Sequence, residues 1–209
     1  MATIWKFDVK IGTNEDAVLH EVLSSPVKRC IDCCGIVDPD TDNPIGARYG
    51  SNVKFLPDFP GRPFVQLRIA KEIMAVFPEF EIRPFLMLGN PGGFEAGDDC
   101  MAGKLHRSSV LPRNCPALCR IWAKKLFDIK MFGDVEQKSH CAKCGNMKFK
   151  VKQNRILKKE ELEGFDFFGI RHTTFWTQGI YYCTERFREF ILEKGYTGYT
   201  FEPYYEMED

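Results

Sequence analysis

The sequence lacks an excess of charge of either sign, and it lacks any long run of apolar residues. Its 29 basic residues are matched by 29 acidic residues, so the formal net charge is zero. A general affinity for nucleic acid needs a basic surface, and the overall charge supplies none. No window approaches the roughly 18 apolar residues of a membrane span, and the first residues lack the pattern of a secretory signal. These absences predict a soluble, cytoplasmic protein.

Histidine is also scarce, because the chain has only four: His20, His106, His140 and His172. Their order with the cysteines and acidic residues does not resemble a nucleophilic triad. The glycine-rich loop 89–109 lacks the Gly-Lys-Ser/Thr ending of a phosphate-binding loop. We therefore expect no enzyme. An enzyme that uses this loop with His106 or His172 stays as an alternative, which requires these groups to share one pocket.

Cysteine, in contrast, is abundant. Nine cysteines are present, and in a reducing compartment paired cysteines are more often metal ligands than disulfides. Two Cys-x-x-Cys pairs offer four thiolates, which is the ligand set of a closed, structural zinc site. We predict that one zinc ion is bound by Cys30, Cys33, Cys141 and Cys144. Cys34 directly follows the first pair, so either Cys33 or Cys34 could be the second ligand there; the spacing favours Cys33.

The two pairs are far apart in the chain, since 107 residues separate Cys33 from Cys141. A shared metal would join the two segments, and closing so long a loop restricts the unfolded chain. We predict a single α+β domain over 1–209, with zinc knuckles near 30–35 and 141–145 and with 36–140 as a large insertion between them. The alternatives are two unrelated pairs or a redox motif.

The apolar patterns predict an α+β fold with a small, mostly antiparallel sheet and about three helices, together with a zinc-ribbon-like element formed by the two distant knuckles. The helices are expected near 64–77, 116–128 and 184–194, and a short helical turn is expected between Asn14 and Leu23. On the second helix Cys115 and Cys119 would be four residues apart, a spacing that could bind metal but is more typical of small apolar residues on a buried face. The expected strands are Thr3–Val9, Ile82–Leu88, Ile129–Val135, Phe165–Arg171, Gly179–Cys183 and Tyr199–Tyr205.

A basic stretch, Lys148–Lys159, follows the second knuckle and could belong to a zinc ribbon that binds nucleic acid. Acidic residues follow it at once, beginning at Glu160, so a mixed, solvated surface is the preferred interpretation. A zinc-ribbon nucleic-acid-binding protein remains the alternative function.

The knuckles and the last part of the chain resemble the bacterial double-CxxCG-motif family. The resemblance is carried by Phe165–Phe168, by the segment Ile180–Phe190 with its Thr-Glu-Arg-Phe motif, and by Gly195 and Gly198–Phe201. The same helix, glycine turn and strand resemble a wider set of immunity proteins of polymorphic toxin systems. The resemblance implies a non-enzymatic protein with structural zinc that binds and neutralises a cognate toxin protein. It leaves the toxin, the contact surface and the oligomeric state open.

Overall fold

The part of the chain that the structure describes is built mainly from strands. The computed structural model describes residues 2–9, 19–23, 30–33, 45–49, 58–59, 64–83, 86–88, 117–155, 157–172 and 180–208. Within these ranges there are two α-helices and two short 3₁₀ helices. The expected α+β fold with about three helices is therefore wrong, because one predicted helix is replaced by strands and the central sheet is a mixed sheet with parallel pairs at both edges.

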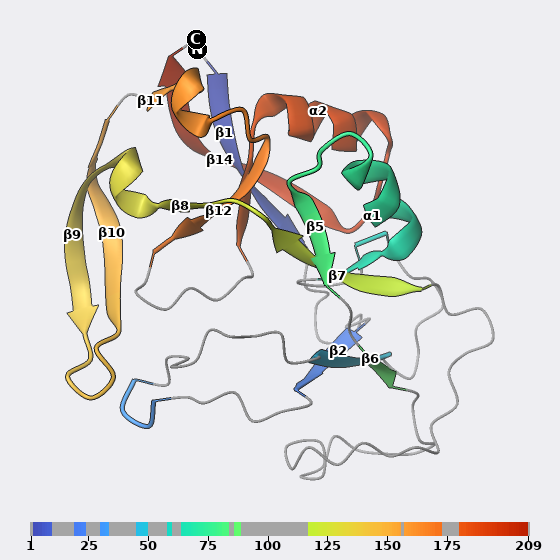
Figure 1. Ribbon diagram of the computed structural model, residues 1–209, viewed down its shortest axis with the longest axis horizontal. Coiled ribbons are helices and arrows are strands. Elements are labelled where there is room, and N and C mark those ends of the chain that lie inside the picture. The colour runs from blue at the N-terminus through green and yellow to red at the C-terminus, as the bar shows by residue number, and fades with distance from the viewer. Residues whose placement is uncertain are drawn as a thin grey trace.

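A six-stranded sheet forms the centre of the molecule, in the order β11-β14-β1-β13-β12-β8 (Figure 1). The two edge strands run parallel to their neighbours, and the inner pairs are antiparallel. Its strands are β1 (Ala2–Val9), β8 (Leu126–Asp128), β11 (Leu157–Lys158), β12 (Phe167–Arg171), β13 (Tyr181–Cys183) and β14 (Tyr199–Glu208). The strands predicted at 3–9, 165–171, 179–183 and 199–205 are thus confirmed in position.

Three smaller sheets accompany the central one. An antiparallel sheet has the order β4-β7-β5, a mixed sheet has the order β2-β3-β6, and β9 pairs with β10 alone. Their strands are β2 (Leu19–Leu23), β3 (Ile45–Tyr49), β4 (Phe64–Gln66), β5 (Phe80–Arg83), β6 (Leu86–Leu88), β7 (Leu118–Ala123), β9 (Gly133–His140) and β10 (Met147–Asn154). The strand expected at 82–88 is two separate strands, β5 and β6. The helical turn expected before Leu23 is wrong where the structure describes it, because β2 is a strand.

Side-chain alternation along the central strands separates two hydrophobic cores. In β1, Phe7 and Val9 belong to one core and Ile4 to the other. In β13, Tyr181 and Cys183 lie in the first core and Tyr182 in the second. Because neighbouring strand residues point to opposite faces, both faces of the sheet are covered. The protein therefore has a large apolar interior on each side of one sheet.

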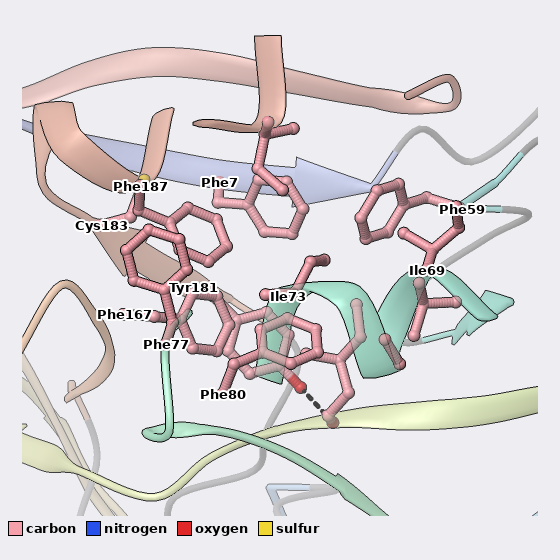
Figure 2. Packing of buried hydrophobic residues seen from close by; sticks show 14 of the residues in the cluster. Phe7, Phe59, Ile69, Ile73, Phe77, Phe80, Phe167, Tyr181, Cys183 and Phe187 are labelled. Carbon is pink, nitrogen blue, oxygen red and sulfur yellow. Dashed lines mark hydrogen bonds between the residues drawn. The ribbon is translucent and has the colours of Figure 1, made fainter. Parts of the chain in front are cut away.

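The first core is dominated by aromatic rings around Phe7 (Figure 2). The ring of Phe7 meets those of Phe59, Phe187 and Phe167 edge-on, with ring centroids 5.4, 5.8 and 6.2 Å away. Edge-to-face geometry is favourable because it brings positive ring edges to negative ring faces. The β4-β7-β5 sheet and both helices close this core, and Tyr181 donates a 2.7 Å hydrogen bond across it to the carbonyl of Ile121.

Both α-helices begin later and are shorter than the sequence pattern predicted. α1 (Leu67–Met74) buries Ile69, Ala70 and Ile73, but residues 64–66 of the predicted helix form β4. α2 (Glu185–Glu193) agrees with the helix expected at 184–194. Thr184 occupies its N-cap position, yet the Thr184 hydroxyl donates to the carboxylate of Asp166 instead of accepting from the helix. Gly195 ends the helix region with a φ of +65°.

The helix expected at 116–128 is wrong. Residues 118–123 form β7 and residues 126–128 form β8, with a bend between them. β7 is the middle strand of its sheet, so Phe64 lies opposite Arg120 on one side and Phe80 lies opposite Ala123 on the other. Residues 129–132, expected to start a strand, form the 3₁₀ helix η1 (Ile129–Phe132), and the strand β9 follows. A second 3₁₀ helix, η2 (Lys159–Leu162), precedes β12.

Candidate metal centre

The second knuckle is the tip of the β9–β10 hairpin. The two strands pair antiparallel from Gly133 opposite Asn154 to His140 opposite Met147. Beyond the last pair, the N–H of Cys141 donates to the carbonyl of Asn146, and the N–H of Gly145 donates to the carbonyl of Cys141, both at 2.8 Å. Gly145 has a φ of +71°, the left-handed conformation that glycine adopts without strain. The glycine after the second cysteine therefore permits the tight turn that closes the knuckle.

The base of this hairpin is attached to the second core. Phe149, Val151 and Val135 pack against that core from the ribbon. The backbone N–H of Phe149 also donates to the carbonyl of His172, and the Arg155 side chain donates to the carbonyl of Met131 at 2.6 Å. The ribbon thus projects from a firm base and presents its cysteines at the far end.

The first knuckle is a turn at residues 30–33 that lies beside this tip, as Figure 1 shows. Cys30 is buried and Cys33 is partly exposed. The sulfur of Cys30 lies 3.6 Å from that of Cys141, and the sulfur of Cys33 lies 3.6 Å from that of Cys144. An exposed ion pair between Lys143 and Asp32, with nitrogen and oxygen 3.5 Å apart, also connects the two turns.

The four sulfur atoms form one compact group, since all lie within 4.8 Å of one another. In a tetrahedral site with metal–sulfur bonds of about 2.3 Å, neighbouring sulfurs are about 3.8 Å apart. The observed spacing fits a metal ion placed among the four. The predicted convergence of Cys30, Cys33, Cys141 and Cys144 is confirmed, and these residues could bind a metal ion. Cys34, the alternative ligand, lies outside the described residues.

Electrostatics at the second knuckle favour one thiolate and oppose a second. Backbone N–H groups of Cys144 and Lys143 point at the sulfur of Cys141 and lower the pKa of that thiol to about 7. At Cys144 the N–H of Asn146 acts in the same direction, but desolvation and the sulfurs of Cys141 and Cys33 outweigh it and raise the pKa to about 12. A cation among the sulfurs removes this repulsion, because metal-bound thiols are deprotonated.

Two other cysteines have a structural role. Cys119 is buried on β7 rather than on a helix, and its thiol contacts the carbonyl of Val65 at 3.6 Å. Burial raises the pKa of Cys119 to about 12, and burial with nearby carboxylates raises the pKa of Cys183 as well. The prediction that Cys119 is a small apolar packing residue is confirmed, and Cys183 packs in the same core. Cys100 and Cys115 lie outside the described residues.

The histidines do not form a described catalytic group. His172 is half-buried, its Nε2 lies 2.9 Å from the hydroxyl of Tyr182, and burial lowers its pKa. His140 is exposed on the last residue of β9, beside Cys141. The loop 89–109 with His106 lies outside the described residues, as does the side chain of His20. The described residues therefore give no support to a shared pocket of His106 and His172.

A hollow of about 320 Å³ adjoins the cysteine group. Sequence reasoning did not predict it, because it forms only where the two knuckles meet. It is lined by side chains of both knuckles and of the hairpin strands: Asp32, Cys33, Ser139, His140, Cys141, Ala142, Lys143, Asn146 and Lys148. Its cationic side chains come from the hairpin, and its carboxylate comes from the first turn.

Comparisons with known proteins give no family for this chain: no family model matches it, and no match was found among curated proteins or solved structures. Among the helices of the described residues, none has the length and apolar character needed to cross a membrane. The arrangement of the four cysteines is thus the feature on which a functional interpretation of this structure rests.

Proposed function

We propose that the protein is a non-catalytic binding protein that neutralises a cognate bacterial toxin, and that its four clustered cysteines hold a structural zinc ion. The observation that carries the proposal is the group of four sulfurs from two distant turns. Four protein ligands fill a tetrahedral ion and leave no position for water or substrate, which is typical of a structural site. Such a site stabilises a binding surface and performs no chemistry.

Zinc is the ion that the donor set favours. Tetrahedral sets of four thiolates are typical of zinc or of iron–sulfur centres. The knuckle geometry, with two Cys-x-x-Cys turns facing each other around one small space, matches the ligand spacing of structural zinc sites. Zinc also suits a non-enzymatic protein because it has no redox chemistry of its own.

The metal is tested by mass spectrometry of the protein purified under reducing conditions without chelator. We expect about one zinc ion per chain, and loss of this zinc in the Cys141→Ser/Cys144→Ser variant. Cys183→Ala is the matched control, because Cys183 is buried away from the group and its replacement leaves the zinc content unchanged. A metal-free wild-type protein would contradict the zinc proposal.

The toxin-binding function follows from the resemblance to immunity proteins together with the character of the site. The segments that carry the resemblance form β12, β13, α2 and β14, which are central to the fold. Within the described residues, the histidines and carboxylates supply no constellation typical of catalysis. A closed metal site and an extended, projecting hairpin suit a protein that acts by contact.

Co-expression tests the function. The toxin encoded beside the gene is produced in a sensitive host with and without this protein, and the two purified proteins are mixed. We expect protection of the host and a stable complex on size-exclusion chromatography. Absence of both protection and complex would overturn the proposed function, whether or not zinc is present.

A further inference from the structure

The β9–β10 hairpin is a strongly basic element in a protein of zero net charge. Residues 133–154 contain five lysines and two acidic residues, which gives a net charge of +3. The five lysines are all exposed: Lys138, Lys143, Lys148, Lys150 and Lys152. An isolated basic element produces a local positive potential that attracts an acidic surface even when the whole molecule is neutral.

Most of this charge is not neutralised by the residues that the structure describes. Lys150 pairs with Glu136 across the ribbon, and Lys143 pairs with Asp32. No carboxylate of the described residues forms an ion pair with Lys138, Lys148 or Lys152. Since surface charges are usually interspersed with the opposite sign, three unpaired lysines on one ribbon mark a surface suited to an outside partner.

An apolar side chain lies at the end of the same surface. Ile31, in the first knuckle, is 78% exposed, which is the greatest exposure among the large hydrophobic side chains that the structure describes as exposed. The sulfur contacts between the knuckles hold the turn that carries Ile31 against the hairpin tip. A single exposed apolar residue is common, but here it directly precedes Asp32, which lines the hollow together with Lys143 and Lys148. Together they combine an apolar contact with cationic groups.

We propose that this tip surface, made of Ile31 and the lysines of the β9–β10 hairpin, is where the protein docks an acidic surface of its partner protein. The inference rests on the proposed function and names the contact surface and its chemistry. The hollow receives a carboxylate side chain of the partner beside Lys148, and Ile31 packs against an apolar neighbour of that carboxylate. Lys138 and Lys152 lie along the ribbon and steer the approach.

A protein partner fits this surface better than nucleic acid. The aromatic residue of the ribbon, Phe149, packs against the second core and is not free to stack on bases. An exposed isoleucine also has no role in contacts with a phosphate backbone, whereas it suits the centre of a protein interface.

The test compares two double variants that change the net charge equally. Lys148→Glu/Lys152→Glu reverses charge on the hairpin. Lys71→Glu/Lys124→Glu is the control, because both control lysines are exposed, lie on other elements and form no described ion pair. Binding to the zinc-loaded proteins is measured by surface plasmon resonance with the neighbouring toxin. We expect the association rate to fall about tenfold for the hairpin variant, with the salt dependence reduced, and to stay unchanged for the control.

Ile31→Ser separates the apolar contact from the charge. We expect it to raise the dissociation rate about fivefold and to leave the association rate unchanged, since short-range packing acts after encounter. Val76→Ser is its control, because Val76 is an exposed apolar residue just after α1, outside the two knuckles and the hairpin. Unchanged binding of the toxin by both the hairpin variant and Ile31→Ser would overturn the docking surface while the proposed function stands.

Two further probes cover the other outcomes. If the toxin does not bind wild-type protein, the proposed function fails. The docking surface is then tested by nuclear magnetic resonance with a ten-residue polyglutamate peptide. Amide chemical-shift changes confined to the tip surface support the docking surface, and their absence overturns it. A 20-base-pair DNA duplex and an RNA hairpin test the remaining class. Steeply salt-dependent binding of either one that the hairpin variant loses and Ile31→Ser keeps would overturn the protein-docking proposal.

Discussion

Gly133 joins η1 to the β9–β10 hairpin in a conformation that other residues rarely adopt. Its φ is +145°, and a Cβ atom there would lie 2.1 Å from the carbonyl oxygen of Gln153. The Arg155 nitrogen and the Asn154 Cα would each lie 3.0 Å away, and all three atoms belong to the backbone at the end of β10, so the hairpin base would have to move. We expect Gly133→Ala to lower the free energy of unfolding by about 3 kcal/mol, measured by urea denaturation.

Gly164→Ala is the matched control for that substitution. Gly164 also has a positive φ, +77°, but a Cβ atom there would meet no atom within 4 Å. Its cost is the backbone term alone, about 1 kcal/mol. Equal effects of the two substitutions would show that the close approach at Gly133 does not contribute.

The two buried thiols, those of Cys119 and Cys183, should be unreactive in the folded protein. Burial raises the pKa of Cys119 to about 12 and raises that of Cys183 as well. Because the thiolate is the reactive form, we expect neither residue to be alkylated by iodoacetamide in the native protein at pH 8. Peptide mapping by mass spectrometry should find both residues labelled only in denaturant. Labelling of either one in the folded protein would contradict the packing described for it.

At the scale of elements, two tyrosine hydroxyls connect separate parts of the fold. Tyr181 of β13 donates to the carbonyl of Ile121 on β7, and Tyr205 of β14 donates to the carbonyl of Phe132 in η1 at 2.6 Å. Replacement of either tyrosine by phenylalanine leaves a buried carbonyl without this donor. We expect each substitution to destabilise the protein by about 1 to 2 kcal/mol, measured as a shift in the urea midpoint.

The Tyr199→Phe variant distinguishes the loss of these two hydrogen bonds from a general effect of removing a tyrosine hydroxyl. Tyr199 packs against the first core, and its hydroxyl makes no hydrogen bond among the described residues. We expect this control to change stability by less than about 0.5 kcal/mol. A similar loss in all three variants would contradict a specific role for the two carbonyl contacts.

The strand β7, which was predicted to be part of a helix, shows that the periodicity of apolar residues cannot always distinguish a helix from a strand. Leu118, Ile121 and Trp122 have helical spacing, yet Cys119, Ile121 and Ala123 also alternate, and these three are the apolar residues of β7 that are buried. A short apolar run of this length fits either a helix or a strand. The pairing with β4 and β5, which involves residues far away in the sequence, decides the outcome.

The cysteine group, in contrast, could be predicted from spacing because its chemistry is local. Each Cys-x-x-Cys turn already places two sulfurs on one side of the backbone. The fold then has only to bring the two turns next to each other to complete a set of four ligands. Their separation of 111 residues along the chain did not prevent this prediction. The hollow and the tip surface could not be predicted, since they depend on the side chains that the two turns place next to each other.

At the scale of the whole molecule, metal removal should loosen one end of the protein and leave the rest folded. The two cores contain their own aromatic and aliphatic packing, and the cysteines lie at the far end of the hairpin. A ligand that binds only the native state contributes stability according to its concentration and affinity. We expect chelation to lower the melting temperature while near-ultraviolet circular dichroism of the cores is retained.

Hydrogen exchange after chelation provides the local measurement. Amides of the knuckles, including those of Cys141 and Gly145, should exchange faster, whereas amides of β1 and β13 should keep their protection. Complete unfolding on chelation would contradict this division, because it would mean that the apolar cores are insufficient without the metal.

The order of strands in the central sheet also has a consequence for how the protein is made. β1 lies between β13 and β14, which are more than 170 residues further along the chain. During synthesis β1 leaves the ribosome well before β13 and β14, and it has neither neighbour until the long segment between them has been translated. At about 5 to 20 residues per second this takes roughly 10 to 40 seconds. For that time an apolar strand with two open edges is a natural substrate for chaperones.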